Sequence, residues 1–417
     1  MVDDEFAALC ARARVAARKL APHPRAVKDE ALKALAKRLR ASKDDILAAN
    51  ARDMARAESK GVSPAMLDRL ALDDRRIASM ADGVAQIADL DDPVGETIAE
   101  QTRPSGIKIT RVRVPIGVIA MIYEARPNVT AEASALCLKA GNAVVLRGGT
   151  EASASNAAIA KCVTEALDDA RLPRDAAQLI TIADRDAVRA LVQQTETVDL
   201  VIPRGGEGLI RTVTEQSRVP VVQHYKGVCH LYLDEGCDAD MAKKLVVDGK
   251  LSRPGVCNAL ECLLVNEKDA KRLLEPIGAA LAQGSCEVHG DEKTRAILPD
   301  VKAATADDWG KEFLDRVIAI RVVENLDEAM AHVARFGSGH TEAICTKNQA
   351  HADRWRREVD AACVVVNAST RFHDGGQFGL GAEIGIATSR LHWRGPMGLE
   401  SLTTMKWVVD GEGQVRG

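Results

Sequence analysis

The sequence predicts an α/β protein built mainly on parallel sheets. Near-continuous apolar runs, such as residues 116–122 and 260–265, recur along the chain, and segments with the apolar spacing of helices separate them. Buried parallel strands have this continuous apolar character, and strands that alternate with helices form parallel sheets. The chain has 417 residues, of which 46% are hydrophobic. It is therefore too long for one compact domain, and we expect two or three.

Helices are predicted over residues 1–90. Leu32, Leu35 and Leu39 lie at helical spacing, and Ser63 followed by Pro64 has the pattern of a capped helix start. No chemical motif stands out in this region, so we interpret these helices as scaffold.

Residues 97–114 predict a two-stranded ribbon. Apolar and polar residues alternate from residue 107 to residue 114, and Pro104-Ser105-Gly106 marks a turn. An isolated hairpin leaves unpaired edges and is marginally stable, so it needs a further strand. Residues 403–409 are the candidate. A ribbon completed by the C-terminal segment predicts a sheet between subunits, and hence a homo-oligomer.

Beyond residue 114 strands and helices are expected to alternate to the end of the chain. Strands are predicted at 116–122, 143–146, 179–182, 200–202, 219–222, 230–233, 260–265, 318–323, 343–345 and 363–366. Helices are predicted at 130–140, 153–168, 239–248, 267–281, 326–334 and 350–359. We place a domain boundary near residues 226–229.

Composition excludes several classes of function. The net charge is −4 with both signs mixed along the chain, so nucleic acid is not an expected partner. No charged-then-apolar signal region opens the chain and no apolar run approaches eighteen residues, so we expect no membrane association and a cytoplasmic protein. The ten cysteines are scattered without a C-x-x-C pair, which argues against a metal site and a disulfide framework.

Cys257 is the candidate nucleophile. Pro254 and Gly255 form a turn that delivers the thiol to the head of the strand at 260–265. Only the thiolate attacks carbonyl groups, and backbone N–H groups together with Arg253 would favour that anion. The alternative is a buried cysteine that packs as a small hydrophobe. The polar surroundings and the following Asn258 favour the nucleophile.

Two glycine-containing turns are candidates for binding a cofactor. Gly205 and Gly206 lie between a predicted strand and a predicted helix, where backbone N–H groups can approach an anion. The spacing differs from G-x-G-x-x-G, so a plain tight turn stays open. Arg147 ends another strand before two glycines, and its guanidinium matches the 2′-phosphate of NADP. A solvated surface arginine is the alternative.

Asn128 follows the strand at 116–122. An amide on a loop above the sheet can donate to a developing oxyanion. The alternative is a helix N-cap, because asparagine is a favoured cap and a helix follows.

Together these segments resemble the aldehyde dehydrogenase family. Residues 114–119, residues 139–147 and a cysteine at the head of a strand look like that fold. Within the family, the resemblance is to the gamma-glutamyl phosphate reductases. It covers essentially the whole chain and is carried by residues 123–130, 252–261, 337–344, 374–385 and 394–407.

The resemblance implies a Rossmann-like cofactor domain, an α/β catalytic domain and a β-ribbon for oligomerisation. We assign residues 1–96 and 115–228, with part of 385–400, to the cofactor domain, 229–384 to the catalytic domain, and 97–114 with 401–417 to the ribbon. The implied reaction is the NADPH-dependent reduction of L-glutamate 5-phosphate to L-glutamate 5-semialdehyde with release of phosphate, in proline biosynthesis. The preference for NADPH over NADH and an association with glutamate 5-kinase stay open.

The resemblance also implies roles for single residues. Cys257 forms a thioester, and Asn128 with the Cys257 N–H holds the oxyanion. Glu312 aligns with the residue that holds the nicotinamide ribose, and Arg147 stands where relatives carry a lysine that contacts the adenosine ribose. We expect Arg253 to bind the departing phosphate, with Arg204 as the second candidate. His340 and Arg371 are candidates for binding the substrate α-carboxylate or for supporting positions, and a surface charge is a further alternative for Arg371.

One departure from the family pattern is informative. Hydrolytic relatives carry Glu-Leu-Gly-Gly-Lys upstream of the cysteine, and its glutamate activates water. The matching stretch here is His224-Tyr225-Lys226-Gly227, without that base. A reductase needs its thioester to wait for hydride. A CoA-acylating or other non-hydrolytic aldehyde dehydrogenase also lacks the base, and a catalytically silent binding protein is an alternative of another class.

Overall fold

The computed structural model describes residues 2–182 and 186–416. The chain divides into two compact units. The first comprises Met1–Gln223, Leu380–Gly385 and Met397–Gly417, and the second comprises His224–Gly379 and Ile386–Pro396. The division after Gln223 lies a few residues before the predicted boundary near 226–229. None of the described helices is long and apolar enough to cross a membrane.

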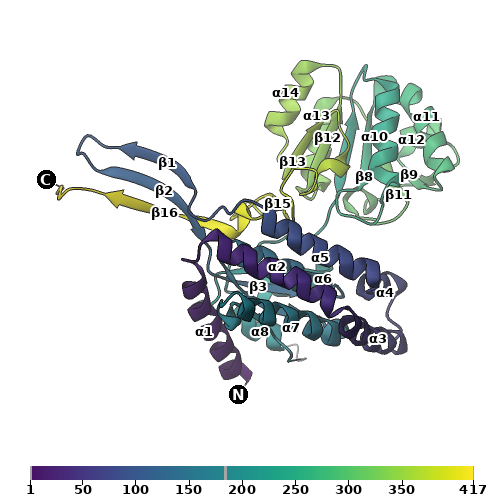
Figure 1. Cartoon of the computed structure of the whole chain (residues 1–417). Coiled ribbons are helices and arrows are strands. Elements are labelled where there is room, and N and C mark those ends of the chain that lie inside the picture. The colour runs from purple at the N-terminus through teal and green to yellow at the C-terminus, as the bar shows by residue number, and fades with distance from the viewer. Residues whose placement is uncertain (1, 183–185, 417) are drawn as a thin grey trace. The chain divides into compact units, whose positions relative to one another are not determined.

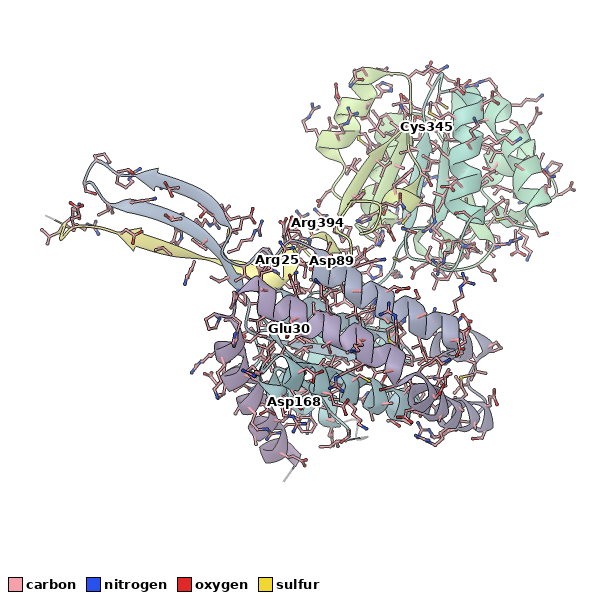
Figure 2. All side chains as sticks on the ribbon, in the orientation of Figure 1. Arg25, Glu30, Asp89, Asp168, Cys345 and Arg394 are labelled. Atoms are coloured by element: carbon pink, nitrogen blue, oxygen red, sulfur yellow. The ribbon has the colours of Figure 1, made fainter. Side chains whose placement is uncertain are left out.

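The first unit opens with helices, as the sequence predicts for residues 1–90. They are α1 (Val2–Leu20), α2 (Arg25–Ala41), α3 (Lys43–Ser59), α4 (Pro64–Leu70) and α5 (Asp74–Asp89). Leu32, Leu35 and Leu39 are buried. Ser63 caps α4 by accepting a hydrogen bond from the Met66 N–H. Arg25 Nη2 donates to the Asp89 carbonyl oxygen at 3.2 Å, which ties the start of α2 to the end of α5 (Figure 2).

The ribbon is an antiparallel sheet of three strands that extends from the helices of the first unit (Figure 1). Its order is β1 (Thr97–Thr102), β2 (Lys108–Pro115) and β16 (Thr403–Asp410). The pairing of β2 with β16 runs from Pro115 opposite Thr403 to Lys108 opposite Asp410. The predicted ribbon and its third strand are confirmed.

The core of the first unit is a parallel sheet of four strands in the order β5-β4-β3-β6. Its elements are β3 (Val118–Tyr123), α6 (Asn128–Lys139), β4 (Ala143–Gly148), α7 (Ser153–Asp169), β5 (Ala177–Leu179), α8 (Asp186–Val192), β6 (Leu200–Arg204) and α9 (Glu207–Gln216). The order changes direction at β3, because β4 lies on one side of it and β6 on the other. Ligands of open α/β sheets bind at such a switch point, outside the carboxyl ends of the strands.

Two predicted strands differ from the structure. The strand predicted at 179–182 begins earlier and is β5. The strand predicted at 219–222 is wrong, because this segment makes only an isolated bridge between Val221 and Val201. An apolar run beside a sheet can pack against it without joining the ladder of backbone hydrogen bonds.

The second unit contains a parallel sheet of seven strands in the order β10-β9-β11-β8-β7-β12-β13 (Figure 1). Its strands are β7 (Cys229–Leu233), β8 (Leu260–Asn266), β9 (Glu287–Gly290), β10 (Lys302–Ala303), β11 (Val317–Val323), β12 (Thr341–Cys345) and β13 (Cys363–Val366). Its helices are α10 (Ala239–Leu251), α11 (Ala270–Gln283), α12 (Glu292–Ile297), α13 (Leu326–Phe336) and α14 (Gln349–Glu358). The sequence did not predict β9, β10 or α12, which are too short to show a period.

Apolar side chains fill the interior of this unit on either side of the sheet. One cluster joins strands of the sheet to α10 and α11, and another joins strands of the sheet to α13 and α14. Cys345, at the end of β12, is buried in the first of these clusters (Figure 2).

Short elements complete the chain. β14 (Gly385–Ala387) and β15 (Gly395–Met397) pair with each other where the chain passes between the units. The 3₁₀ turns are η1 (Thr150–Ala152), η2 (Arg174–Ala176), η3 (Glu267–Asp269), η4 (Asp308–Gly310), η5 (Thr370–Phe372) and η6 (Glu400–Leu402).

Candidate active site

Cys257 lies in the turn between α10 and β8, and its residue is half-buried. Pro254 lies shortly after α10 and cannot continue that helix. The Ala259 N–H donates to the Val256 carbonyl oxygen at 3.0 Å, which closes the turn around the cysteine. The sequence prediction that a turn presents this thiol at the head of a strand agrees with this position.

Asn258 fastens a second loop to this turn. Its side-chain Nδ2 donates to the carbonyl oxygens of Arg371, at 3.3 Å, and of His373, at 3.0 Å. The Thr370 hydroxyl donates to the Asn258 carbonyl oxygen at 2.8 Å. The loop that carries Arg371 is therefore held beside Cys257 by a residue that sequence reasoning had used only as a polar neighbour.

Gly227 packs directly against the cysteine backbone. A Cβ atom at this position would stand 2.0 Å from the Cys257 carbonyl oxygen. The Gly227 N–H donates to Glu312 Oε1 at 2.9 Å, so Glu312 lies close to the same turn. These contacts explain why residues 224–228, which we assigned to the cofactor domain, group with the second unit instead.

Two histidines lie near the Cys257 sulfur. One donor atom from each of His224, Cys257 and His340 lies within 4.8 Å of the other two. His224 comes shortly before β7, Cys257 shortly before β8, and His340 immediately before β12. Because β8, β7 and β12 are parallel neighbours, their amino ends meet at one edge of the sheet and bring these three side chains together.

A buried hydrogen-bond chain orients His340. The Thr341 hydroxyl oxygen lies 2.7 Å from Nδ1 of His340 and 2.7 Å from Nδ1 of His373. The hydroxyl has one proton, so it donates to one ring and accepts from the other. Burial lowers the pKa of His373 to about 4. Burial also holds the pKa of His340 well below its usual range, and the nearby His224 lowers both pKa values further. Both rings are therefore neutral near pH 7.

The neutral state of His340 affects the roles predicted for it in binding the substrate. A neutral, fully buried His340 cannot attract a carboxylate by charge, which favours the supporting position among the two predicted roles. Arg371 is half-buried and its Nε atom has no hydrogen-bond partner among the described residues. Arg253 is exposed in the cysteine turn. Arg253 is therefore placed where an anion can reach it, and the ligands of both arginines stay predictions.

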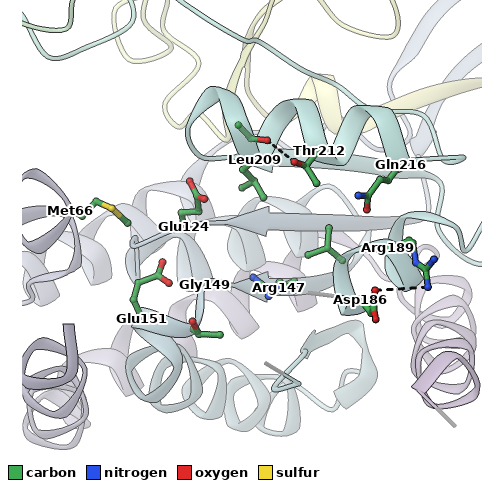
Figure 3. A pocket seen from close by; sticks show the side chains of 13 residues that line it. Met66, Glu124, Arg147, Gly149, Glu151, Asp186, Arg189, Leu209, Thr212 and Gln216 are labelled. Carbon is green, nitrogen blue, oxygen red and sulfur yellow. Dashed lines mark hydrogen bonds and ion pairs between the residues drawn. The ribbon is translucent and has the colours of Figure 1, made fainter. Parts of the chain in front are cut away.

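The first unit contains a pocket of about 820 Å³ at the carboxyl ends of its parallel strands (Figure 3). Arg147 from the end of β4 lines it together with Glu124, Glu151, Gly149 and Leu209. Arg147 Nε is buried and has no partner within the described ranges. Burial lowers the pKa of Arg147, and the nearby Glu151 and Glu124 oppose this shift. A half-buried guanidinium whose Nε atom lacks a partner suits an anionic ligand such as a nucleotide phosphate.

Gly205 and Gly206 lie at the end of β6 and the start of α9. The Gly206 N–H donates to Glu124 Oε2 at 3.0 Å, and a Cβ atom at Gly205 would stand 2.4 Å from the same oxygen. A side chain at residue 205 would therefore have to displace the Glu124 carboxylate, whereas a Cβ atom at Gly206 would stand 4.0 Å from it. In the structure the Gly206 N–H therefore binds the chain's own Glu124, and a role for these glycines in cofactor binding stays a prediction.

Asn128 is the first residue of α6, and the preceding Pro127 occupies the N-cap position. The alternative of a capping role for Asn128 is therefore wrong. Its Nδ2 atom donates to both carboxylate oxygens of Glu132, each at 3.1 Å. Burial raises the pKa of Glu132, and the hydrogen bond from Asn128 opposes that shift. Asn128 belongs to the first unit, and its pairing with Cys257 stays a prediction.

Comparisons with known proteins place these features. Residues 2–311 match the model of the aldehyde dehydrogenase family. The chain belongs to this family. It is 57% identical to the gamma-glutamyl phosphate reductase of Sorangium cellulosum (strain So ce56) over 98% of this chain and 97% of that protein. It is 53% identical to the one of Xanthomonas campestris pv. campestris (strain B100), over 98% and 99%. The predicted resemblance is thus confirmed.

Solved structures confirm the aldehyde dehydrogenase-like fold. The gamma-glutamyl phosphate reductase of Thermotoga maritima has a TM-score of 0.98 and 47% identity, over 99% of this chain and all of that one. An acetylating aldehyde dehydrogenase from Geobacillus thermoglucosidasius has a TM-score of 0.70 at 19% identity, over 100% and 98%. The second likeness concerns the fold alone. Membership of the aldehyde dehydrogenase family implies a nicotinamide cofactor.

Sequence reasoning did not single out several residues of the site in this family member: His224, Thr341, His373, Glu124 and Glu132. The sequence marks His224 only as part of a segment that lacks a glutamate. A usable signal existed for His224 and Thr341, because both lie at or near the amino ends of predicted parallel strands. No pattern in the sequence marks His373, which reaches the site through the loop that Asn258 holds.

Proposed function

We propose that this protein reduces L-glutamate 5-phosphate to L-glutamate 5-semialdehyde with release of inorganic phosphate, in the synthesis of proline from glutamate. NADPH is the proposed reductant and Cys257 the proposed nucleophile. The observation that carries the proposal is the position of the half-buried Cys257 in a hydrogen-bonded turn, with its sulfur near His224 and His340. The names of relatives 53–57% identical over nearly the whole chain support the substrate.

The reaction begins with loss of the thiol proton. His224 and His340 are the nearby imidazoles. Burial keeps the pKa of His340 so low that it is a poor proton acceptor, so we assign the proton to the more exposed His224. The thiolate attacks the acyl carbon, the bond from that carbon to the phosphate oxygen breaks, and a thioester remains on Cys257 while phosphate leaves.

The attack creates an oxyanion on the substrate carbonyl. The Cys257 N–H and the Asn128 amide are the proposed donors to it. Loss of one such donor typically costs about 10²–10³ in rate. Asn128 Nδ2 donates to Glu132 in the structure, and this contact presets the amide in one orientation.

The pocket beside Arg147 is the proposed site for the dinucleotide. Its size, its place at the carboxyl ends of β3, β4 and β6, and the incompletely paired guanidinium all fit a phosphate-containing cofactor. We propose that Arg147 contacts the 2′-phosphate that distinguishes NADPH from NADH, and that Glu312 holds the nicotinamide ribose. When bound there, the reduced nicotinamide would be the source of the hydride that the acyl carbon accepts. Cys257 then leaves as thiolate and the aldehyde is released.

Water must not reach the thioester first. No glutamate occupies positions 224–227, where hydrolytic relatives carry their base. His224 cannot activate water while it holds the proton that it took from the thiol. This supports a reductase over a hydrolytic dehydrogenase.

The reverse reaction tests the proposal and separates it from the CoA-acylating alternative. Semialdehyde, inorganic phosphate and NADP⁺ are mixed with the protein, and NADPH absorbance is followed with each component left out in turn. We expect formation of NADPH only when all three are present, and none when CoA replaces phosphate. Turnover that needs CoA and not phosphate would reject the proposed substrate.

A Cys257→Ala variant tests the covalent route in the same assay. We expect no turnover with the fold and NADPH binding retained. Cys363→Ala removes another half-buried thiol of the same unit and should keep full activity. Substantial turnover by Cys257→Ala would reject the thioester, and a silent wild-type protein that binds no NADPH would support the binding-protein alternative.

Further proposals concern the oligomeric state and the cellular location of the protein. We propose that the ribbon joins copies of the chain into a homo-oligomer, since Trp407 and Val409 expose 60% and 59% of their surface on β16. We propose a cytoplasmic location, because a reducing compartment keeps Cys257 as a thiol. Association with glutamate 5-kinase remains a prediction.

A further inference from the structure

The side chains around Cys257 form a ligand set for a soft divalent cation. One donor atom from each of His224, Cys257 and His340 lies within 4.8 Å of the other two. A thiolate and two imidazoles are the ligands that Zn²⁺ prefers, and they do not suit Mg²⁺ or Ca²⁺. Three protein ligands leave a fourth position of the tetrahedron for water, as in zinc sites that are open to solvent.

His340 provides an independent indication of a ligand. Its side chain is fully buried, and its Nδ1 atom lies 2.7 Å from the Thr341 hydroxyl. Its Nε2 atom is buried and has no hydrogen-bond partner in the described part of the chain. A buried polar atom without a partner is costly unless a water or a ligand satisfies it. The contact between Nδ1 and a fixed polar group is the usual way in which proteins orient a metal-binding histidine.

A similar cluster in the same unit shows what such a group looks like when it is not a metal site. His230, Cys262 and His332 also have donor atoms within 4.8 Å of one another. Arg321 Nη1 donates to Nδ1 of His332 at 2.9 Å, so the ring proton is on Nε2, which lies 3.6 Å from the Cys262 sulfur. That nitrogen has no lone pair for a metal, and all three residues are buried.

The cluster at Cys257 differs on both counts. His224 and Cys257 are half-buried and not fully buried, which leaves this cluster partly open to solvent. The Thr341 hydroxyl can accept as well as donate, so His340 can carry its proton on Nδ1 and present the lone pair of Nε2.

We propose that the full-length protein binds one Zn²⁺ through the Cys257 sulfur and the imidazoles of His224 and His340, and that the bound ion holds the enzyme inactive. Binding forms a zinc–sulfur bond, releases the thiol proton to solvent and transfers no electron. The binding stands on the geometry alone, whereas the inactivation rests on the proposed role of Cys257 in catalysis. The absence of a C-x-x-C pair argues only against a metal site whose ligands come from one loop. His224, Cys257 and His340 come instead from the segments before three different strands.

Direct binding to the full chain tests the site. Zn²⁺ is titrated against the protein in competition with a chromogenic chelator, and Co²⁺ is used as a spectroscopic probe in its place. We expect one ion per chain and a thiolate-to-cobalt absorption band. Cys257→Ala should abolish the band, whereas Cys363→Ala should keep both the band and the affinity. Thr341→Val removes the group that orients His340 and should weaken Zn²⁺ binding about 10–100-fold, as expected for an outer partner of a ligand.

Activity measurements distinguish Zn²⁺ binding at this site from inactivation of the enzyme by the bound ion. Stoichiometric Zn²⁺ should stop turnover, and EDTA should restore it. Binding that is absent, or that is unchanged in both Cys257→Ala and Thr341→Val, overturns the site even if Cys257→Ala proves inactive. Binding with the cobalt band but with turnover undiminished leaves the site standing and overturns the catalytic role of Cys257.

Discussion

The backbone of Gly227 lies against the backbone of Cys257 so closely that a methyl group on residue 227 would stand 2.0 Å from the Cys257 carbonyl oxygen and 2.8 Å from its Cα atom. The atoms that it would meet are backbone atoms, which cannot swing aside as a side-chain tip can. The same glycine donates its N–H to Glu312. One residue therefore contacts both the Cys257 turn and the carboxylate proposed to hold the ribose.

We predict that Gly227→Ala strongly reduces turnover. The added methyl group must displace the Cys257 turn, and a shift of about 1 Å at a reacting group costs on the order of 10²-fold in rate. The reaction of semialdehyde, phosphate and NADP⁺ measures the loss. Gly83→Ala is the control, because a Cβ atom at this position of α5 meets no described atom within 4 Å. It should keep full activity and stabilise the helix by about 0.5–1 kcal/mol. Equal activity of the two variants would contradict the geometry.

Arg147 is predicted to select the cofactor. If its guanidinium pairs with the 2′-phosphate, Arg147→Ala removes a charged hydrogen bond worth about 1.5–3 kcal/mol. The KM for NADPH should then rise about 10- to 100-fold while the kinetics with NADH stay nearly unchanged. Lys60 is the alternative partner for the 2′-phosphate. With Arg56 it lines a neighbouring pocket, and Gly149 and Thr150 line both pockets. A larger effect from Lys60→Ala than from Arg147→Ala would move the phosphate contact to that pocket.

The sequence predicted what depends on local pattern. The apolar run of β8, the cap at Ser63 and the alternation in β2 each follow from neighbouring residues, and each lies where it was expected. The run at 219–222 has the same local pattern, but its only ladder contact is the bridge from Val221 to Val201. Composition does not distinguish an apolar segment that packs beside a sheet from one that joins it.

The site was predictable to the extent that resemblance and turn chemistry mark single residues. Cys257 and Arg147 lie where strand-end reasoning put them. The gathering of His224 and His340 around the sulfur depends on the strand order β8-β7-β12, which no local pattern encodes. The contact of Glu124 with Gly206 likewise depends on β3 and β6 being neighbours.

The exposed face of β16 is predicted to bind a second copy of the chain. Met405, Trp407 and Val409 alternate along the strand and so share one face, with 40%, 60% and 59% of their surfaces exposed. We expect Trp407→Glu to dissociate the oligomer, measured as a fall in mass by light scattering. Lys406→Glu changes the charge on the opposite face of the same strand and should leave the mass unchanged. A wild-type protein that is monomeric, or a Trp407→Glu variant with the wild-type mass, would refute the assembly.

A buried ion pair links α10 and β8, the two elements that flank the Cys257 turn. We predict that removal of either charge alone destabilises the fold. Lys250 Nζ and Glu261 Oε2 lie 2.6 Å apart, and both side chains are fully buried. At about pH 8, where Glu261 is mainly ionised in the wild type, Lys250→Met leaves the buried carboxylate without its cation and should lower the free energy of unfolding by about 3–5 kcal/mol. The double variant Lys250→Met/Glu261→Met removes both charges and should recover most of the loss. Urea unfolding measures both, and a double variant no more stable than the single one would contradict the pairing.

The same pair predicts a pH dependence. Burial raises the pKa of Glu261 to about 7, although Lys250 and the backbone N–H groups of Leu314 and Phe313 oppose the shift. The unfolded chain releases this proton near its ordinary pKa of about 4.3, so between these values the folded state binds more protons than the unfolded one. Stability contributed by this group is therefore full at low pH and falls as pH rises through that window, by an amount on the order of 3 kcal/mol. Urea unfolding at several values from about pH 5 to pH 8 should show this slope in the wild type. The double variant should lack it, since neither charge remains, and the same slope in both proteins would assign the effect to other groups.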